Sequence, residues 1–305
     1  MTDTNPRHFL DVDDLSTDEL EAVLDLAAEY KRKQRTDEAH PDLERRTLGM
    51  LFQKPSTRTR VSFETGMTQL GGHAVFLGES DIHLGRGEPL RDTARALSRY
   101  VDVVMARVFK HGNVVELARH STVPVVNGLT DDAHPCQTLA DLLTITESVG
   151  TDVSVAWIGD GNNVAQSFVL GCALCGIDCT VATPEGYGIE DRIVERAAEI
   201  GEAPTITTDP GAAAEGADVL YTDVWISMGQ EDERDLRESA FSGFRIDEGL
   251  LERANDPVVM HCLPAHRGEE ITDGVIEGQR SVVWEQAENR LHAQKALLVW
   301  LLDAA

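Results

Sequence analysis

The segment of the chain best suited to chemistry is residues 52–60, which read FQKPSTRTR. A short apolar run meets a proline here, and hydroxyl and guanidinium side chains follow: Ser56, Thr57, Arg58, Thr59 and Arg60. A helical pattern begins at once, and a helix N-terminus presents unpaired backbone N–H groups at the positive end of its dipole. Such an end binds anions, and the side chains add donors around it. We therefore predict a phosphate cradle at Ser56–Arg60, in preference to a capped helix with surface arginines.

Polar residues of similar potential follow other apolar runs of the chain. The runs end near residues 106, 126, 158, 224 and 260. The polar groups that follow them are, in the same order, Arg107 with Lys110 and His111, His134–Gln137, Gly159–Asn163, Trp225–Gly229 and His261–Pro264. Asp223 lies near the end of the fourth run. Each group alone has an ordinary structural explanation. Their shared placement at the ends of runs is what an enzyme with a cleft requires.

The elements that must position these residues alternate along the chain. We expect strands at 47–52, 74–77, 101–106, 123–126, 153–158, 178–182, 205–208, 219–224 and 258–262. Helices are expected near 16–35, 57–70, 90–100, 113–120, 164–174, 189–200, 247–254 and 287–302. Strands that are apolar throughout, and that alternate with helices, predict parallel sheets covered on both faces.

The fold class that follows is α/β, with two doubly wound parallel-sheet domains. A chain of 305 residues exceeds what one core usually supports. We assign residues 1–134 to the first domain and 135–287 to the second, joined by an interdomain helix at 135–148, with a C-terminal helix at 288–305 packing back on the first domain. Ligands in such folds bind beyond the carboxyl ends of the strands, so the site is expected there, between facing domains.

The tetrapeptide His134-Pro135-Cys136-Gln137 has a specific geometry. Proline suits the first turn of a helix, which places His134 and Gln137 near a helix start, where both can donate to an oxygen. Taken alone, His134 reads equally well as a loop histidine, and Arg107 as a surface arginine. The last helix is expected to begin near Glu288, which puts Arg290 at its start.

Two motifs suggest other chemistry, and neither is well supported. Gly159–Val164 follows a strand and opens a helix as a dinucleotide-binding loop does, but Val164 replaces the third glycine and no acidic residue ends the next strand. A nicotinamide cofactor is therefore disfavoured. Cys172, Cys175 and Cys179 lie in apolar surroundings, which favours buried small residues over a metal site. We expect no metal and no cofactor.

The chain is strongly acidic, with 53 acidic and 27 basic residues and a net charge of −26. Only five of the 27 basic residues are lysine, so the other 22 are arginine. A diffuse acidic surface repels nucleic acid and anionic membranes, so neither is an expected partner. Its self-repulsion is screened by salt, and we interpret the composition as adaptation to a high-salt cytoplasm, as in a halophile. An ordinary acidic protein is the alternative.

The expected compartment is the cytoplasm. No stretch approaches the roughly 18 apolar residues of a membrane span, and residues 1–14 are polar and acidic without the apolar core of a signal peptide. Five cysteines in no regular pattern are consistent with a reducing environment.

Taken in chain order, eight segments resemble the motifs of the carbamoyltransferases: FQKPSTRTR, DIHLGRGE, MARV, HPCQ, GDGNN, DVWISMG, HCLPAHRGEEI and ENR. The resemblance covers nearly the whole chain. Pieces such as STRTR are common to the aspartate/ornithine carbamoyltransferase family. HCLP together with the Ser-Met-Gly loop is specific to the ornithine branch, which the chain resembles most closely.

The resemblance implies roles for individual residues. Carbamoyl phosphate would be bound by Ser56, Thr57, Arg58, Thr59, His83, Arg107, His134, Gln137, Cys262, Leu263 and Arg290. Ornithine would be bound by Asn163, Asp223, Ser227 and Met228. The catalytic residues would be Arg58, Arg107, His134, Asp223 and Cys262. His83, in the loop 78–87, would reach a neighbouring subunit, so the resemblance also implies a homotrimer or an assembly of trimers.

The implied reaction is transfer of the carbamoyl group of carbamoyl phosphate to the δ-amine of L-ornithine, giving citrulline and phosphate in arginine metabolism. Donors at Arg58, Arg107 and His134 suit the charge that develops on the carbonyl oxygen and the leaving phosphate. An amine with a pKa of about 10.4 must lose a proton before it attacks. Asp223, Cys262 and the phosphate itself are all candidates for accepting that proton.

Three alternatives stay open. Aspartate is the first rival acceptor, although this chain has Arg86 before Gly87-Glu88 where the aspartate branch has a lysine. The second rival acceptor is another amine, either putrescine or an acylated ornithine. Asp223 with the Ser-Met-Gly loop favours a free α-amino acid over these two amines. A non-catalytic phosphate-binding homologue is the third, and it would not need the polar residues of the second half.

Overall fold

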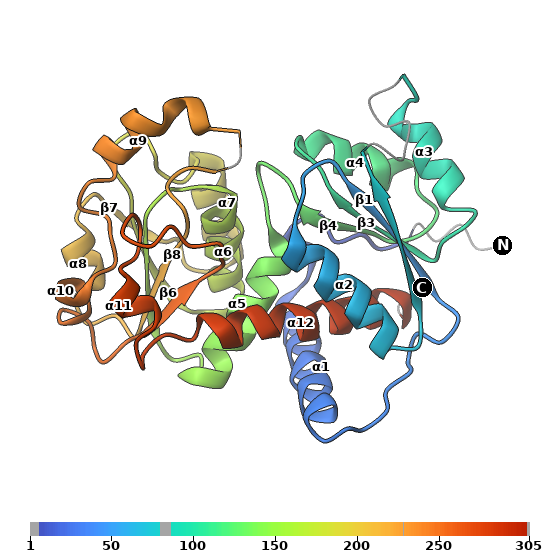
Figure 1. The fold of residues 1–305 in the computed structure, drawn as a ribbon, viewed down its shortest axis with the longest axis horizontal. Helices are drawn as coiled ribbons and strands as arrows, with labels where there is room; N and C mark the ends of the chain where they lie inside the picture. Colours follow the sequence, from blue (N-terminus) through green and yellow to red (C-terminus); the bar gives the residue numbers. More distant parts are fainter. Residues whose placement is uncertain (1–5, 80–86, 228, 304–305) are drawn as a thin grey trace. The chain divides into compact units, whose positions relative to one another are not determined.

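The computed structural model describes residues 6–79, 87–227 and 229–303 (Figure 1). The chain divides into two compact units, one formed by Met1–Leu143 with Asn289–Ala305 and the other by Thr144–Glu288. Both passages between the units occur within helices, α5 (Pro135–Ser148) and α12 (Val283–Asp303). The boundaries expected from the sequence, after residues 134 and 287, fall nine residues and one residue before these divisions.

The first unit contains a four-stranded parallel sheet. Its strands are β1 (Thr47–Phe52), β2 (His73–Gly78), β3 (Val103–Arg107) and β4 (Val125–Leu129), in the order β2-β1-β3-β4. The strands β3 and β4 are buried along their whole length, as continuous apolar runs predict, whereas the edge strand β2 is only partly buried. Because the strands are parallel, the residues that follow β1, β3 and β4 gather at one edge of the sheet.

Helices cover both faces of this sheet (Figure 1). Helices α3 (Leu90–Leu97) and α4 (His111–His120) lie on one face, and α1 (Thr17–Arg35), α2 (Thr57–Gln69) and α12 lie on the other. The start of α1 is the predicted capping box: Glu19 N–H donates to Ser16 Oγ at 3.3 Å, and Ser16 N–H donates to Glu19 Oε2 at 2.9 Å.

The second unit contains a five-stranded parallel sheet. Its strands are β5 (Ser154–Ile158), β6 (Asp178–Ala182), β7 (Thr205–Thr207), β8 (Val219–Thr222) and β9 (Val258–His261), in the order β7-β6-β5-β8-β9. Helix α6 (Asn163–Cys175) is buried along most of its length, and its Phe168 packs edge-on against Tyr221 with ring centroids 5.0 Å apart. The order changes direction at β5 and β8, where ligands of doubly wound folds bind.

Two parallel sheets with helices on their faces confirm the predicted fold class, with differences in detail. The unit-two helices α7 (Asp191–Ile200) and α10 (Glu248–Leu251) match expected segments, but α8 (Pro210–Ala214), α9 (Arg234–Ala240) and α11 (Asp273–Ile276) were not predicted. The expected start of the last helix near Glu288 is wrong, because α12 begins at Val283. Arg290 therefore lies inside a helix, and Arg107 is the last residue of β3 instead of following it.

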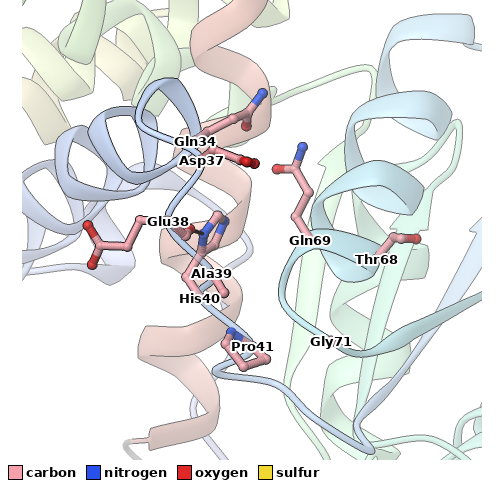
Figure 2. Close-up of a pocket in the computed structure, with 9 residues that line it drawn as sticks. All are labelled: Gln34, Asp37, Glu38, Ala39, His40, Pro41, Thr68, Gln69 and Gly71. Carbon is pink, nitrogen blue, oxygen red and sulfur yellow. Dashed lines mark hydrogen bonds between the residues drawn. The ribbon is translucent and has the colours of Figure 1, made fainter.

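Within the first unit, α1, α2 and α12 meet around a buried lysine, Lys295. Its ammonium donates to Gln69 Oε1 at 2.9 Å and Gln34 Oε1 at 3.4 Å, and lies 3.2 Å from His40 Nε2. Burial without a carboxylate partner lowers the pKa of Lys295 to about 8. These three neighbours also line a surface pocket of about 400 Å³, whose other lining includes Asp37 and Glu38 (Figure 2).

Among the described residues, no helix combines the length and apolar character needed to cross a bilayer.

Candidate active site

The N-terminus of α2 begins directly after β1, as the phosphate-cradle prediction requires. Ser56 is the N-cap, and its hydroxyl accepts the N–H of Thr59 at 3.2 Å and donates to Thr59 Oγ1 at 3.1 Å. Thr57 is exposed, Arg58 is half-buried and Thr59 is buried. The hydroxyls of Ser56 and Thr59 thus hold the first turn in shape, and the first backbone N–H groups of the helix keep the arrangement that binds anions.

Arg60 does not share this geometry, and the expectation that it belongs to the cradle is wrong. Its guanidinium pairs with Glu64 at 2.9 Å and lies over the ring of Phe76, 3.8 Å from the centroid. The pair is an ordinary i,i+4 contact on an exposed helix face. Of the two arginines in the segment, only Arg58 remains a candidate for the anion site.

Positive charge converges on His134, which lies before α5. The histidine is 5 % exposed, as is Arg107 at the end of β3. Burial, and then the charges of Arg290, Arg107 and Arg58, hold the pKa of His134 well below its ordinary value. His134 is therefore neutral at physiological pH, and its imidazole can donate one hydrogen bond to a substrate oxygen without carrying a charge of its own.

The neutral state of His134 has a measurable consequence for stability. Below pH 6.5, its ordinary value, the unfolded chain takes up a proton that the folded chain refuses, so stability falls as pH falls. In a His134→Gln variant this contribution disappears. We expect the difference in unfolding free energy between parent and variant to change by up to about 1.4 kcal/mol per pH unit in this window. Denaturant unfolding between pH 5 and 8 measures it, and a pH-independent difference would contradict a neutral His134.

A chain of buried polar contacts fixes the side chain of Arg290. Its Nη1 donates to Gln137 Oε1 at 2.6 Å, and its Nη2 donates to Thr59 Oγ1 at 3.4 Å. Gln137 Nε2 in turn donates to Asp141 Oδ1 at 2.8 Å, so both ends of this amide are engaged. Asp141 was not among the predicted residues, although it lies one turn after Gln137 in α5 and is fully buried. The contacts link α2, α5 and α12 around one cationic site.

Lys54 is a second residue near the site that was not predicted as a site residue. It is buried, forms an ion pair with Asp131 and lies 4.7 Å from the ring centre of Phe109. Asp131 follows β4 and Lys54 follows β1, so the pair ties together two loops at the same edge of the sheet. The sequence gives one indication that Lys54 belongs to the site. The residue lies two positions before Ser56, in a chain that has only five lysines.

In the second unit, Asp223 lies directly after β8 and is buried. Its Oδ1 accepts the thiol of Cys262 at 2.9 Å, and its Oδ2 accepts Nδ2 of Asn162 at 2.8 Å. Asn162, which was not predicted as a site residue, also caps α6 by accepting the N–H groups of Val164 and Ala165. The strand-end residues predicted from the sequence therefore meet here, with the Asp223 carboxylate as acceptor.

Cys262 and Leu263 are held by a buried imidazole–carboxylate pair. His261 Nδ1 accepts the N–H of Leu263 at 2.9 Å, so the ring proton lies on Nε2, which donates to Glu270 Oε1 at 3.0 Å. Both His261 and Glu270 are fully buried. Leu263 adopts a left-handed backbone conformation (φ 61°), which is uncommon for a residue other than glycine. Glu270 was not predicted, and its contact with His261 orients the Leu263 backbone.

The remaining predicted residues are distributed as follows. Asn163 is the first residue of α6, and Ser227 lies in the loop after β8, where its N–H donates to Gln230 Oε1 at 3.0 Å. His83 and Met228 lie outside the described residues, as does Arg86. Cys172 and Cys179 are buried, and Cys175 is partly exposed.

Two side-chain groups among the described residues have the types and closeness of metal ligands. One is Asp223 with His261 and Cys262, and the other is His266 with Glu269 and Glu270. In the first group the carboxylate, imidazole and thiol already take part in the hydrogen bonds described above. We therefore assign no metal to the first group.

Packing explains one glycine of the loop after β5. A Cβ at Gly161 would lie 2.4 Å from the backbone of Gly188, so no side chain fits there. The loop instead presents Asn162 and Asn163 at the start of α6.

Fold and site together define an α/β protein of two units, one with a helix N-terminus of the kind that binds anions and the other with a carboxylate–thiol site. The carbamoyl-P binding domain model of aspartate/ornithine carbamoyltransferases matches residues 7–147, and the Asp/Orn binding domain model matches residues 151–301. The chain belongs to the aspartate/ornithine carbamoyltransferase family.

Individual relatives agree with this assignment. The chain is 63 % identical to an ornithine carbamoyltransferase from Haloquadratum walsbyi, over 97 % of this chain and 98 % of that one. A solved ornithine carbamoyltransferase from Pyrococcus furiosus superposes with a TM-score of 0.95 at 50 % identity, covering 98 % of both chains. An anabolic enzyme from Campylobacter jejuni gives 0.92 at 40 % identity, over 98 % of this chain and 100 % of that one.

Proposed function

We propose that this chain is a carbamoyltransferase that transfers the carbamoyl group of carbamoyl phosphate to the δ-amine of L-ornithine, giving citrulline and phosphate. The observation that carries the proposal is the convergence of Arg58, Arg107 and Arg290 on a neutral, buried His134. Three guanidiniums suit a dianionic acyl phosphate, and an uncharged imidazole suits its carbonyl oxygen. The relatives named above support ornithine as the acceptor.

In the first unit, the proposed phosphate site is the N-terminus of α2 with Ser56, Thr57, Arg58 and Thr59, together with Arg107. The proposed carbamoyl contacts are His134, Gln137 and Arg290, with the Leu263 backbone and Cys262 as further candidates. Gln137 Oε1 accepts from Arg290, and its Nε2 donates to Asp141, so we assign Gln137 the task of orienting Arg290. His83 is retained as a proposed phosphate contact on the family resemblance alone.

The chemistry these residues perform is stabilisation of developing charge. As the amine attacks the carbamoyl carbon, negative charge builds on the carbonyl oxygen and then on the departing phosphate. Fixed donors at Arg58, Arg107, Arg290 and His134 meet both sites of charge without reorganising. No covalent enzyme intermediate is needed, because the leaving group is already a good one and the nucleophile is the second substrate.

In the second unit, we assign Asp223 to the amino groups of ornithine. Its carboxylate is held by Asn162 and Cys262 and can accept a further hydrogen bond from an ammonium. The thiol proton of Cys262 points to Asp223, so Cys262 acts as a donor in this state. Asn163, Ser227 and Met228 remain proposed contacts of the α-amino acid head group. The δ-ammonium must lose a proton before attack, with the Asp223 carboxylate or the phosphate as acceptor.

An acceptor panel tests the proposal. Purified protein in molar KCl is given carbamoyl phosphate with L-ornithine, L-aspartate or putrescine at equal concentrations. Carbamoylated product is expected with L-ornithine at a rate at least about a hundredfold above the other two, because a site built for polar groups rejects ligands that leave those groups unpaired. A higher rate with aspartate or putrescine would contradict ornithine as the acceptor and would assign the chain to another branch of the family.

The assembly, compartment and salt adaptation are also proposals. We propose a homotrimer or an assembly of trimers on the family resemblance, a cytoplasmic location, and adaptation to high salt on the net charge of −26.

Salt adaptation has a direct expectation. Carboxylates that repel one another destabilise the folded state, and salt screens that repulsion. Between about 0.1 M and about 2 M KCl we expect the midpoint of thermal unfolding to rise by about 5 °C or more. Sucrose at matched osmolality is the control, because it stabilises without screening charge. An unfolding midpoint that is flat or falls with KCl would refute the proposal.

A further inference from the structure

Arg237 is the buried residue of α9, a helix that is otherwise exposed and rich in charge. Its Nη1 donates to Asp160 Oδ2 at 2.9 Å and to the carbonyl of Trp225 at 3.0 Å. Its Nε donates to Glu233 Oε2 at 3.0 Å, and its guanidinium lies 5.1 Å from the ring centre of Tyr187. A surface helix thus sends one cation into the interior of the second unit, where it meets four partners.

The three hydrogen-bond partners of Arg237 belong to the two loops that carry the proposed ornithine contacts. Asp160 lies in the loop after β5, three residues before Asn163. Trp225 and Glu233 lie at opposite ends of the loop after β8, which carries Ser227. One guanidinium therefore closes the base of the β8 loop and ties it to the β5 loop.

The interior around Arg237 makes a merely stabilising role a poor explanation. Trp225 stacks on Phe241 with centroids 5.8 Å apart, so the loop base is already packed by apolar contacts. A buried ion pair contributes little net stability, because desolvation offsets its attraction. Burial raises the pKa of Asp160 to about 6, and Arg237 opposes that rise. The pair instead fixes the geometry of the loops, because a planar guanidinium binds its hydrogen-bond acceptors only in certain directions.

We propose that Arg237 is a positioning residue for the amino-acid substrate. It holds the β8 loop, with Ser227, in register with the β5 loop, with Asn163, so that both meet the α-amino and α-carboxylate groups of ornithine. This inference rests on the proposed function. The carbamoyl-phosphate donors of the first unit lie outside its network, so it acts on one substrate and not on the other.

The test is steady-state kinetics in molar KCl with Arg237→Ala and the matched control Arg234→Ala. Arg234 lies on the same helix, but its guanidinium is on the surface, paired with Glu238 at 3.0 Å. For Arg237→Ala we expect the ornithine KM to rise about tenfold or more while the carbamoyl phosphate KM stays within about twofold. Arg234→Ala should leave both constants near those of the parent.

Two milder variants keep the test decisive if Arg237→Ala folds poorly. Arg237→Lys keeps the positive charge but loses the planar guanidinium with its several donors. Asp160→Asn keeps the shape of the side chain but loses its negative charge. Both variants should raise the ornithine KM by smaller factors than Arg237→Ala. Binding of L-norvaline, which has the head group of ornithine without the δ-amine, should weaken in the same order. Ornithine KM values unchanged in all three variants would overturn the inference, as would equal rises for both substrates. A parent that makes no citrulline would instead overturn the proposed function.

Discussion

Replacing Arg58 by alanine is expected to lower kcat/KM for carbamoyl phosphate by about a thousandfold, the scale of removing a preorganised donor to developing charge. Arg58 lies in the first turn of α2 and is one of the three guanidiniums whose charges act on His134. The protein has a net charge of −26, which repels an anionic substrate. Each cation at the site must therefore offset this repulsion as well as bind the phosphate. Initial rates at varied carbamoyl phosphate and saturating ornithine measure the change.

The matched control is Arg60→Ala, two residues further along the same helix. Arg60 carries the same charge, but it is paired with Glu64 and lies over Phe76. We expect this variant to keep kcat/KM within about threefold of the parent, because pairs of this kind contribute little. Equal losses in the two variants would mean that general positive charge, and not the placement of Arg58, supports activity.

Replacing Asp223 by asparagine is the second change with a large expected effect. The variant keeps one of the two oxygens that accept from Asn162 and Cys262, and it loses the negative charge that faces the amine. We expect kcat/KM for ornithine to fall by about a hundredfold or more, since a charged hydrogen bond and a proton acceptor are lost together. The carbamoyl phosphate KM should change little. Rates at varied ornithine and saturating carbamoyl phosphate give the result.

Asp218→Asn is its control, because Asp218 precedes the same strand β8 at the opposite end. Its carboxylate accepts the N–H of Ser154 at 3.0 Å and Nδ2 of Asn255 at 2.9 Å, both structural contacts. This variant should lose about 1 kcal/mol of stability and keep its kinetic constants. If Asp223→Asn loses stability in the same way but keeps its ornithine kinetics, the proposed role of Asp223 is wrong.

The sequence predicts most of the architecture because the strands carry a strong local signal. Apolar runs define most of the nine strands of the described chain, β1 and β3 among them, and the Ser16–Glu19 capping box fixes the start of α1. Helix α9 was missed because RDLRESA has no apolar stripe, and its one buried side chain is an arginine. The start of α12 was missed because the five residues before Glu288 include an exposed tryptophan, Trp284.

The site was predicted less completely, and the reason is also physical. Residues at strand ends are visible in the sequence because parallel strands bring their carboxyl ends together, and His134, Asp223 and Cys262 were found in this way. Several of their supporting partners are not visible, because they are far away in the chain. Arg237 lies 77 residues from Asp160, and Asn162 lies 61 residues from Asp223. Arg60 was misjudged because residues two apart on a helix face different directions.

The central claim is that this chain joins one carbamoyl group to one ornithine. The most direct test is to follow phosphate and citrulline together, in molar KCl, with carbamoyl phosphate in excess and L-ornithine limiting. We predict that both products form in equal amounts and that both stop when ornithine is exhausted, because phosphate leaves only when the amine attacks. Rates are corrected with a blank that lacks the protein, because carbamoyl phosphate also releases phosphate unaided in water. Protein-dependent release of phosphate that continues without ornithine, or that yields no citrulline, would contradict the claim.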